Sequence, residues 1–224
     1  MDVLILAAGR GERMRPLTDR IPKPLLKAGG TTLIERQIDR LVSAGHDRLV
    51  INLAHLGGKI EATLGDGSRY GAHITYSPEP PGALDTGGGI VQALKHLHGD
   101  CFAAVNADIW TDFPYREMPS AIRGAAWLVL VENPPHNPRG DFGLHHGVVQ
   151  PARIPGGDTL TFAGIGVYRR SLFDGCAPGR YPLLPILSAA VARGDVAGIR
   201  YRGAWTDVGT PERLEALRSA AAEP

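Results

Sequence analysis

Six apolar residues near the start of the chain, 3–8, end abruptly at Gly9-Arg10-Gly11. A run this short, bounded by glycine, is typical of a strand buried on both faces of a sheet. Ligands of open α/β sheets bind outside the carboxyl ends of the strands. Glycine at that place lets backbone N–H groups approach phosphate oxygens closely. The sequence therefore predicts an α/β fold with an anion site directly after its first strand.

The loop that follows this strand is rich in cations. It carries Arg10, Arg13 and Arg15, and Lys23 follows between two prolines. Guanidinium and ammonium groups neutralise phosphate charge and donate hydrogen bonds to phosphate oxygens. Together with the glycines they indicate a polyphosphate site. Arg10 and Arg15 are also compatible with a role as solvated loop charges.

Three other interpretations compete for the Gly-x-Gly pattern. A dinucleotide-binding fingerprint requires a third glycine where this chain has Met14. A P-loop requires Gly-Lys-Ser/Thr, which nothing in this loop supplies. An ordinary tight turn accounts for the two glycines alone, but it leaves the cation-rich loop unexplained.

Apolar runs and helical patterns alternate along the first half of the chain, as in a parallel sheet covered by helices on both faces. Thr32 and Glu35 form a capping-box pattern, and Gly45 is placed to cap the far end of that helix. Further strands are expected at 48–52, 73–76, 101–106 and 127–131. Further helices are expected at 56–64, 88–97, 183–193 and 211–221.

From Asn133 the pattern changes to turn-rich sequence and short runs with hairpin character. These runs span 141–145, 148–150 and 160–168. They predict an antiparallel appendage on the parallel sheet that forms the far wall of a cleft. A chain of 224 residues supports one well-buried domain. We therefore expect a single domain over 1–224 with two lobes, 1–132 and 133–224.

Composition narrows the class of partner. With 24 Lys+Arg against 23 Asp+Glu, the net charge of +1 implies no basic face for nucleic acid or a membrane surface. Cys101 and Cys176 give no disulfide framework. The first apolar run is too short for a membrane span and lacks the basic flank of a signal peptide. These features predict a cytoplasmic protein, and they carry no information on oligomeric state.

Two aspartates stand where a metal ion could bind. Asp108 follows the expected strand 101–106, and Asp207 lies in an extended piece that leads into a helix. A hard cation such as Mg²⁺ prefers one or two carboxylates together with phosphate oxygens and water. By spacing alone, however, each aspartate is equally an ordinary turn or loop residue. Both interpretations stand open on these grounds.

Two further regions offer polar groups to a ligand. Glycines 87–89 precede the expected helix 88–97 and present backbone groups to a base edge, unless they form a flexible loop. Asn106 and Asp141 are placed to hydrogen-bond a sugar from opposite walls, although Asp141 is also a plausible hairpin turn residue. The sequence shows no Ser/His/Asp or paired-carboxylate acid–base constellation.

The whole chain resembles the nucleoside-diphosphate-sugar pyrophosphorylase family, the sugar-1-phosphate nucleotidylyltransferases. The resemblance rests on GxGxRxxP at 9–16, the Pro-Lys-Pro lysine at 23, and the strings NADIWTD, RGDFGL and WTDVGT. It implies a Rossmann-like three-layer nucleotidyltransferase (GT-A-like) α/β fold, with a mostly parallel central sheet and a small antiparallel second lobe. Residues 1–132 would bind the nucleotide and residues 133–224 the sugar. Ala107 departs from the glycine of many relatives, but it is small.

The same resemblance implies roles for individual residues. Arg13, Lys23 and Asp108 would be catalytic, and Asp108 with Asp207 would hold Mg²⁺. Asn106 and Asp141 would bind the sugar phosphate. The residues expected to bind the nucleotide are Ala8, Gly9, Gly11, Glu12, Arg13, Lys23, Glu79 and Gly87.

The implied reaction joins UTP to a sugar 1-phosphate, N-acetylmuramic acid α-1-phosphate, and releases pyrophosphate, in bacterial cell-wall sugar recycling. The attacking phosphate is largely a dianion at pH 7, because its second pKa is about 6, so no general base is needed. Another hexose 1-phosphate with dTTP or GTP remains an alternative. A non-catalytic nucleotide-sugar sensor is disfavoured because the four Arg, Lys and Asp positions are all present, and an oxidoreductase is disfavoured by Met14.

Overall fold

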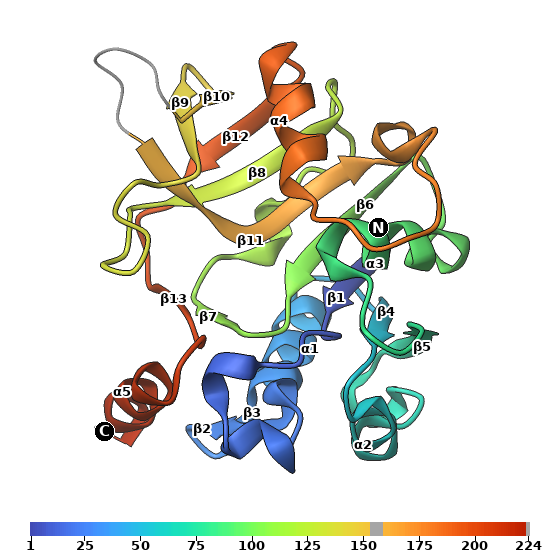
Figure 1. Cartoon of the computed structure of the whole chain (residues 1–224), viewed down its shortest axis with the longest axis vertical. Coiled ribbons are helices and arrows are strands. Elements are labelled where there is room, and N and C mark those ends of the chain that lie inside the picture. The colour runs from blue at the N-terminus through green and yellow to red at the C-terminus, as the bar shows by residue number, and fades with distance from the viewer. Residues whose placement is uncertain (153–158, 223–224) are drawn as a thin grey trace.

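The computed structural model describes residues 1–152 and 159–222. Within these ranges a nine-stranded mixed sheet forms the centre of the molecule (Figure 1). Its strand order is β5-β4-β1-β6-β11-β8-β12-β10-β9. These strands span β1 Val3–Leu6, β4 Arg48–Leu53, β5 His73–Pro78, β6 Cys101–Asn106, β8 Ala126–Val131, β9 Phe142–His145, β10 Val148–Pro151, β11 Thr159–Arg169 and β12 Val196–Arg200.

The first four strands in this order are parallel, as the alternating pattern predicted. Leu6 at the end of β1 pairs with Asn52 of β4 on one side and with Asn106 of β6 on the other. Because parallel strands end at the same edge of a sheet, the segments that follow β1, β4 and β6 meet there.

The second half of the sheet is mixed. β11 runs antiparallel between β6 and β8, β12 pairs parallel with β8, and the β9–β10 hairpin forms the edge. The hairpin strands predicted as an appendage therefore continue the central sheet, because β11 bonds directly to β6. The sheet takes strands from both sides of the predicted lobe boundary at residue 132. Strand β12 was not predicted.

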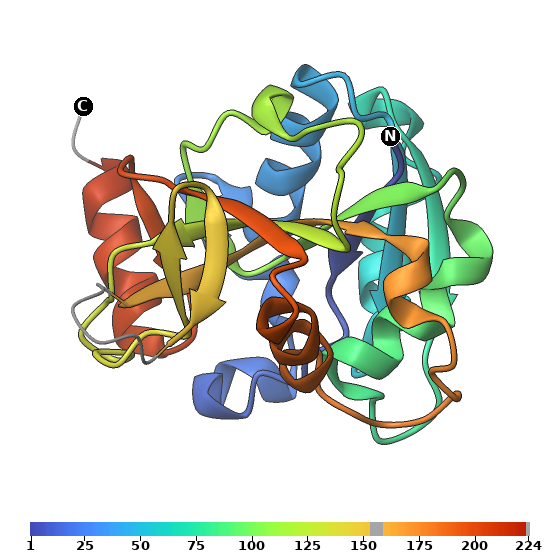
Figure 2. The same ribbon diagram turned by 90° about the horizontal axis from the view of Figure 1, so that it is seen from above.

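Helices cover both faces of the sheet, and Figure 2 shows α1 on the opposite side from α3 and α4. Alternate residues of β1 face opposite layers: Val3 and Ile5 pack with helices α1 and α2, while Leu4 packs with α3 and α4. All three are fully buried, as expected of a strand covered on both faces. The helices span α1 Leu33–Ser43, α2 Gly57–Leu64, α3 Asp85–Ala93, α4 Leu184–Ala192 and α5 Pro211–Ala222.

The predicted capping box is confirmed at the start of α1. The Thr32 hydroxyl accepts from the Glu35 backbone N–H at 3.2 Å, and a Glu35 carboxylate oxygen accepts from the Thr32 N–H at 3.2 Å. Two donors left open by the first helical turn are thereby satisfied. Gly45 follows the helix with φ +87°, the left-handed conformation that glycine adopts without strain.

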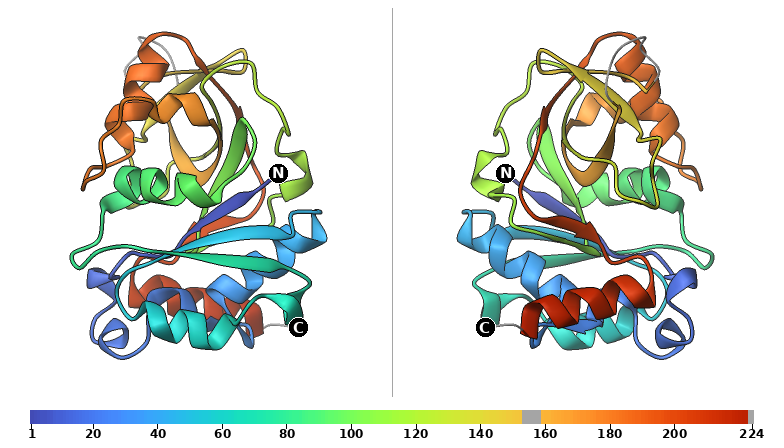
Figure 3. Two further views of the ribbon diagram at one scale, coloured as in Figure 1. Left: turned by 90° about the vertical axis from the view of Figure 1, so that its right-hand side faces the viewer. Right: turned by 90° about the vertical axis from the view of Figure 1, so that its left-hand side faces the viewer.

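Two short antiparallel ribbons complete the described part of the chain. β7 Ile109–Thr111 pairs with β13 Trp205–Asp207, and β2 Lys27–Ala28 pairs with β3 Thr31–Thr32. Helix α5 lies beside β2 (Figure 3). Short 3₁₀ helices span Glu12–Met14, Leu17–Asp19, Lys23–Leu25, Ser68–Tyr70, Leu94–His96, Tyr115–Glu117 and Arg170–Phe173. Among the described helices, none is both long and apolar enough to span a bilayer.

Candidate active site

A cleft of about 360 Å³ opens at the carboxyl ends of β1, β4 and β6. This is the edge at which an open α/β sheet binds its ligands. The cleft brings together most of the predicted site residues. Those that line it are Ala8, Gly9, Gly11, Glu12, Arg13, Lys23, Glu79, Asn106 and Asp108.

The loop after β1 takes its shape from Gly11 and Met14. Gly11 has φ +68°, and a Cβ built on it would lie 3.0 Å from Thr18 Cγ2 and 3.3 Å from Lys23 Cβ. Glycine therefore supplies both the left-handed backbone and the space that lets Lys23 approach. Met14 is fully buried in a small core with Leu33 of α1 and Val208. The residue that departs from the dinucleotide fingerprint thus anchors the loop after β1.

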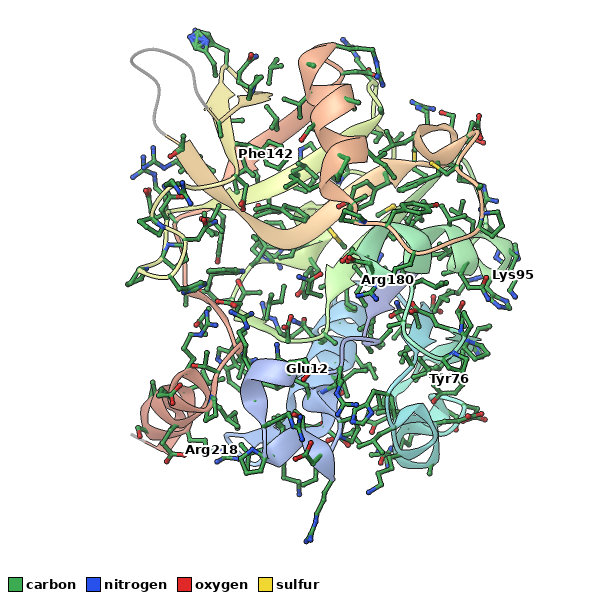
Figure 4. All side chains as sticks on the ribbon, in the orientation of Figure 1. Glu12, Tyr76, Lys95, Phe142, Arg180 and Arg218 are labelled. Atoms are coloured by element: carbon green, nitrogen blue, oxygen red, sulfur yellow. The ribbon has the colours of Figure 1, made fainter. Side chains whose placement is uncertain are left out.

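The three arginines of this loop differ in their surroundings. Arg10 pairs with Glu12 at 2.7 Å, and Arg15 pairs with Asp19 at 2.9 Å. These are exposed ion pairs (Glu12 is labelled in Figure 4), so Arg10 and Arg15 are the solvated charges that the sequence allowed. Of the three, only Arg13 lines the cleft.

Lys23 and Asp108 form an ion pair inside the cleft. Lys23 begins a 3₁₀ turn between Pro22 and Pro24, both buried, so the backbone that carries it is fixed. Its side chain is only 11% exposed, whereas that of Asp108 is 28% exposed. The pair places one cation and one carboxylate at the end of β6.

Pairing between β7 and β13 brings the second aspartate to the same region. The Val208 N–H donates to the Asp108 carbonyl at 2.8 Å, and Asp207 is in register with Ile109. Asp207 itself is not among the cleft-lining residues, but Gly209, two residues on, is. One Asp207 oxygen lies 2.5 Å from Arg213 Nη1 and 2.9 Å from His136 Nε2.

The donor set fits a hard divalent cation that completes its shell with substrate. Within residues 1–152 and 159–222, no group of three or more His, Cys, Asp and Glu side chains is arranged to hold a metal. Asp108, in the turn before β7, and Asp207, the last residue of β13, supply two carboxylates, and Mg²⁺ sites commonly use that number with phosphate oxygens and water.

Asn52 is a site residue that the sequence interpretation missed. It ends the run of β4 at the cleft edge, is 3% exposed, and accepts from the Ala7 N–H at 2.7 Å. Its amide donates to Glu79 Oε1 at 2.7 Å, while Glu79 Oε2 accepts from the Leu84 N–H at 2.7 Å. The chain of bonds fixes Glu79 at the side of the cleft. A polar residue at the end of an apolar strand was the available signal.

Apart from Asp207, two predicted residues do not line this cleft. Gly87 lies inside α3, and its N–H donates to the Tyr181 carbonyl at 3.0 Å, so it is not free to read a base edge. The prediction that Gly87 contacts the nucleotide does not fit this geometry. Asp141 accepts from Asn137 Nδ2 at 3.1 Å and from the Phe162 N–H at 2.8 Å, outside the cleft. Its role at a sugar stays a prediction.

The structure has a mixed sheet covered by helices, and a glycine-rich loop with arginine and lysine side chains lies near two carboxylates at the carboxyl ends of its parallel strands. These features are typical of the nucleotidyltransferase class of enzymes. The chain belongs to the nucleotidyl transferase family, whose model matches residues 2–150. It is 48% identical to N-acetylmuramate alpha-1-phosphate uridylyltransferase of Neisseria meningitidis over 99% of this chain and 98% of that protein. The protein of the same name from Caulobacter vibrioides is 32% identical over 98% and 96%.

Solved structures share the fold of this chain. The structure of HddC from Yersinia pseudotuberculosis superposes with a TM-score of 0.81 at 20% identity and covers 98% of both chains. The predicted nucleotidyltransferase fold is therefore confirmed, although the strands predicted as an antiparallel appendage belong to the central sheet.

Proposed function

We propose that this chain transfers UMP from UTP to N-acetylmuramic acid α-1-phosphate, forming the UDP-sugar and pyrophosphate. Two relatives that match nearly the whole chain carry the name of that activity. One structural observation supports the proposal most strongly: the Lys23–Asp108 ion pair lies in the cleft, and strand β13, which ends at Asp207, lies next to it. Both features serve phosphoryl chemistry, because they fix charge around one point.

The reaction requires the two substrates to be positioned and the negative charge on their phosphates to be neutralised. A phosphate oxygen of the sugar 1-phosphate attacks the α-phosphorus, the bond from that phosphorus to the bridging oxygen breaks, and pyrophosphate leaves in line. Lys23 would hold the attacking phosphate beside the α-phosphate. Arg13 and the backbone N–H groups of residues 9–11 would hold the triphosphate and the leaving pyrophosphate. The sugar phosphate is largely a dianion at pH 7, so no side chain has to remove a proton.

Nucleotidyltransferases of this family generally use a divalent metal. We assign that role here to Mg²⁺, held by Asp108 and Asp207. Bound there, the ion would neutralise charge that builds up on the phosphoryl oxygens. Lys23 and Arg213 already offset the two carboxylates, so the acidic groups are held in place before any metal arrives.

The base and the sugar would occupy different sides of the cleft. Glu79, fixed by Asn52 and the Leu84 N–H, would accept hydrogen bonds from the base. Asn106, at the end of β6, would face the sugar phosphate. Assignment of residues 1–132 to the nucleotide and of 133–224 to the sugar remains a prediction, as does a cytoplasmic location.

A substrate panel tests this function. Initial rates of pyrophosphate release would be measured for UTP, dTTP, GTP and CTP, each with the 1-phosphates of N-acetylmuramic acid, N-acetylglucosamine, glucose and mannose. We expect the highest kcat/KM for UTP with N-acetylmuramic acid α-1-phosphate. A preference for GTP with mannose 1-phosphate, or no release with any pair, would contradict the proposal.

A further inference from the structure

A second guanidinium group, that of Arg213, lies beside the cleft wall that Gly209 forms. Arg213 is the third residue of α5, and its side chain is only 19% exposed. Its Nη1 contacts Asp207 Oδ1 at 2.5 Å and lies beside the ring of His136. One nitrogen of the guanidinium is thus committed to the second aspartate.

The other terminal nitrogen, Nη2, points at a different neighbour. A Cβ built on Gly209, which lines the cleft, would lie 2.2 Å from Arg213 Nη2, 2.9 Å from Asp207 Oδ2 and 3.1 Å from Arg13 Nη2. These three atoms therefore surround a single point at the cleft wall. A side chain at position 209 would displace these atoms, so glycine leaves them the room to lie there.

Two like charges are held close together at this point. Both Arg13 and Arg213 present Nη2 to it; the Asp207 carboxylate offsets part of their mutual repulsion, and a bound anion would lower it further. Within residues 1–152 and 159–222, no acceptor is recorded for Nη2 of either guanidinium. A bound phosphate would satisfy both donors, since guanidinium forks match phosphate oxygens.

We propose that Arg213 is a substrate-binding residue whose Nη2 contacts a phosphate oxygen, while its Nη1 holds Asp207 in place. The ligand is a phosphate group of the reaction described above, either of the pyrophosphate moiety or of the sugar 1-phosphate. The inference rests on the proposed function for the identity of these ligands. On sequence alone Arg213 was an ordinary charge in the first turn of a helix.

Calorimetry without metal tests the contact directly. Binding of inorganic pyrophosphate and of N-acetylmuramic acid 1-phosphate would be measured separately, in EDTA, for the unaltered chain, Arg213→Gln and Arg213→Lys. We expect Arg213→Gln to weaken binding of at least one of them about tenfold, equivalent to about 1.4 kcal/mol. Arg213→Lys keeps the charge but loses the two-pronged guanidinium, so its affinity should lie between those of the unaltered chain and Arg213→Gln. The ligand whose affinity falls, pyrophosphate or the sugar 1-phosphate, carries the phosphate group that Arg213 contacts.

Arg218→Gln is the matched control on the same helix. Its guanidinium donates to the Lys27 carbonyl at 2.9 Å, beside β2 and away from the cleft (labelled in Figure 4). This variant should leave both affinities within about twofold, because its charge is screened by solvent. Melting temperatures would establish that each variant is folded, and Arg213→Lys carries the test should Arg213→Gln fail to fold.

The inference and the proposed function fail in different ways. Unchanged affinity of a folded Arg213→Gln for both phosphates would overturn the inference and leave Arg213 as a support for Asp207 alone. Failure of the unaltered chain to bind either phosphate would overturn the inference as well. Failure of the unaltered chain to release pyrophosphate from UTP, with phosphate binding still dependent on Arg213, would overturn the proposed function only.

Discussion

Lys23 and Asp108 stand 85 residues apart in sequence and form an ion pair at the cleft. The fold creates this contact by placing the loop after β1 and the turn after β6 at one edge of the sheet. The cation would contact substrate phosphate, and the carboxylate would contact the metal. The free-energy cost of holding these two side chains in place is offset during folding. The site is therefore preorganised before substrate binds, and preorganisation accelerates phosphoryl transfer.

Lys23→Ala should lower the rate of pyrophosphate release on the order of 10² to 10³-fold, because one preorganised cation is lost. The melting temperature should stay close to that of the unaltered chain. Lys59→Ala is the matched control, since its exposed ammonium donates to the Arg20 carbonyl at 2.7 Å and lies outside the cleft. Near-normal turnover of Lys23→Ala would show that this lysine is not part of the machinery.

Asp108→Asn and Asp207→Asn should each raise the Mg²⁺ concentration needed for half-maximal turnover by on the order of tenfold or more. An amide keeps the shape of the side chain but not the charge that a hard cation prefers. Titrations of activity with Mg²⁺ and of metal binding with Mn²⁺ would measure this. Asp174→Asn, at an exposed turn, should leave both titrations unchanged. If all three variants depended on metal concentration in the same way, Asp108 and Asp207 would not be the metal ligands.

Gly89→Ala should disturb the base side of the cleft without touching a substrate. A methyl group built at Gly89 lies 2.5 Å from Glu79 Oε1 and 2.9 Å from Asn52 Nδ2, so these side chains must move. We expect KM for UTP to rise about tenfold (about 1.4 kcal/mol) with a smaller change in kcat. A KM that stays unchanged would mean that Glu79 does not bind the base.

Gly58→Ala is the counterpart on α2. A Cβ there meets nothing within 4 Å, and the position is exposed. Alanine should therefore stabilise the protein by roughly 0.5–1 kcal/mol, because it lowers the entropy of the unfolded chain. Urea unfolding would show the gain, with KM for UTP unaltered. Destabilisation by Gly58→Ala would indicate contacts that the structure does not contain.

The capping box of α1 should make stability depend on pH. Burial acts to raise the pKa of Glu35, but hydrogen bonds from Thr32 and Tyr70 and the charge of Arg69 together lower it below 4.5. A lowered folded-state pKa adds stability above the unfolded value, and that stability is lost as pH falls through the folded value. The difference in unfolding free energy between the unaltered chain and Glu35→Gln should hold at pH 7 and shrink as the pH falls below 4.5. A difference that stays constant with pH would contradict this.

Local patterns in the sequence predicted several elements closely. The capping box at Thr32 and Glu35 set the start of α1, and the apolar run 101–106 matched β6. Both patterns consist of residues that are close together in sequence, so both elements can be predicted without knowledge of tertiary contacts. The loop after β1 was equally legible, because its glycines and cations are contiguous.

Features that depend on distant partners were missed or misjudged. Strand β12 contains Gly198 and pairs with β8 more than 60 residues earlier, so no local pattern marks it. Glycines 87–89 resemble a ligand loop, yet they form helix α3: a Cβ on Gly88 would lie 2.0 Å from the Gly179 carbonyl. The packing of Gly87 and Gly88 against residues 179–182 becomes visible only when the later segment is in place. Asn52 and Arg213 have ordinary local contexts and acquire their positions from tertiary contacts.

The proposed function requires this cleft to join a nucleotide to a sugar phosphate. Phosphorus NMR of the chain with UTP, N-acetylmuramic acid α-1-phosphate and Mg²⁺ follows both products in one sample. The account predicts UDP-sugar and pyrophosphate in equal amounts, with neither formed by Lys23→Ala on the same time scale. Unchanged UTP, or free UMP in place of the UDP-sugar, would contradict it.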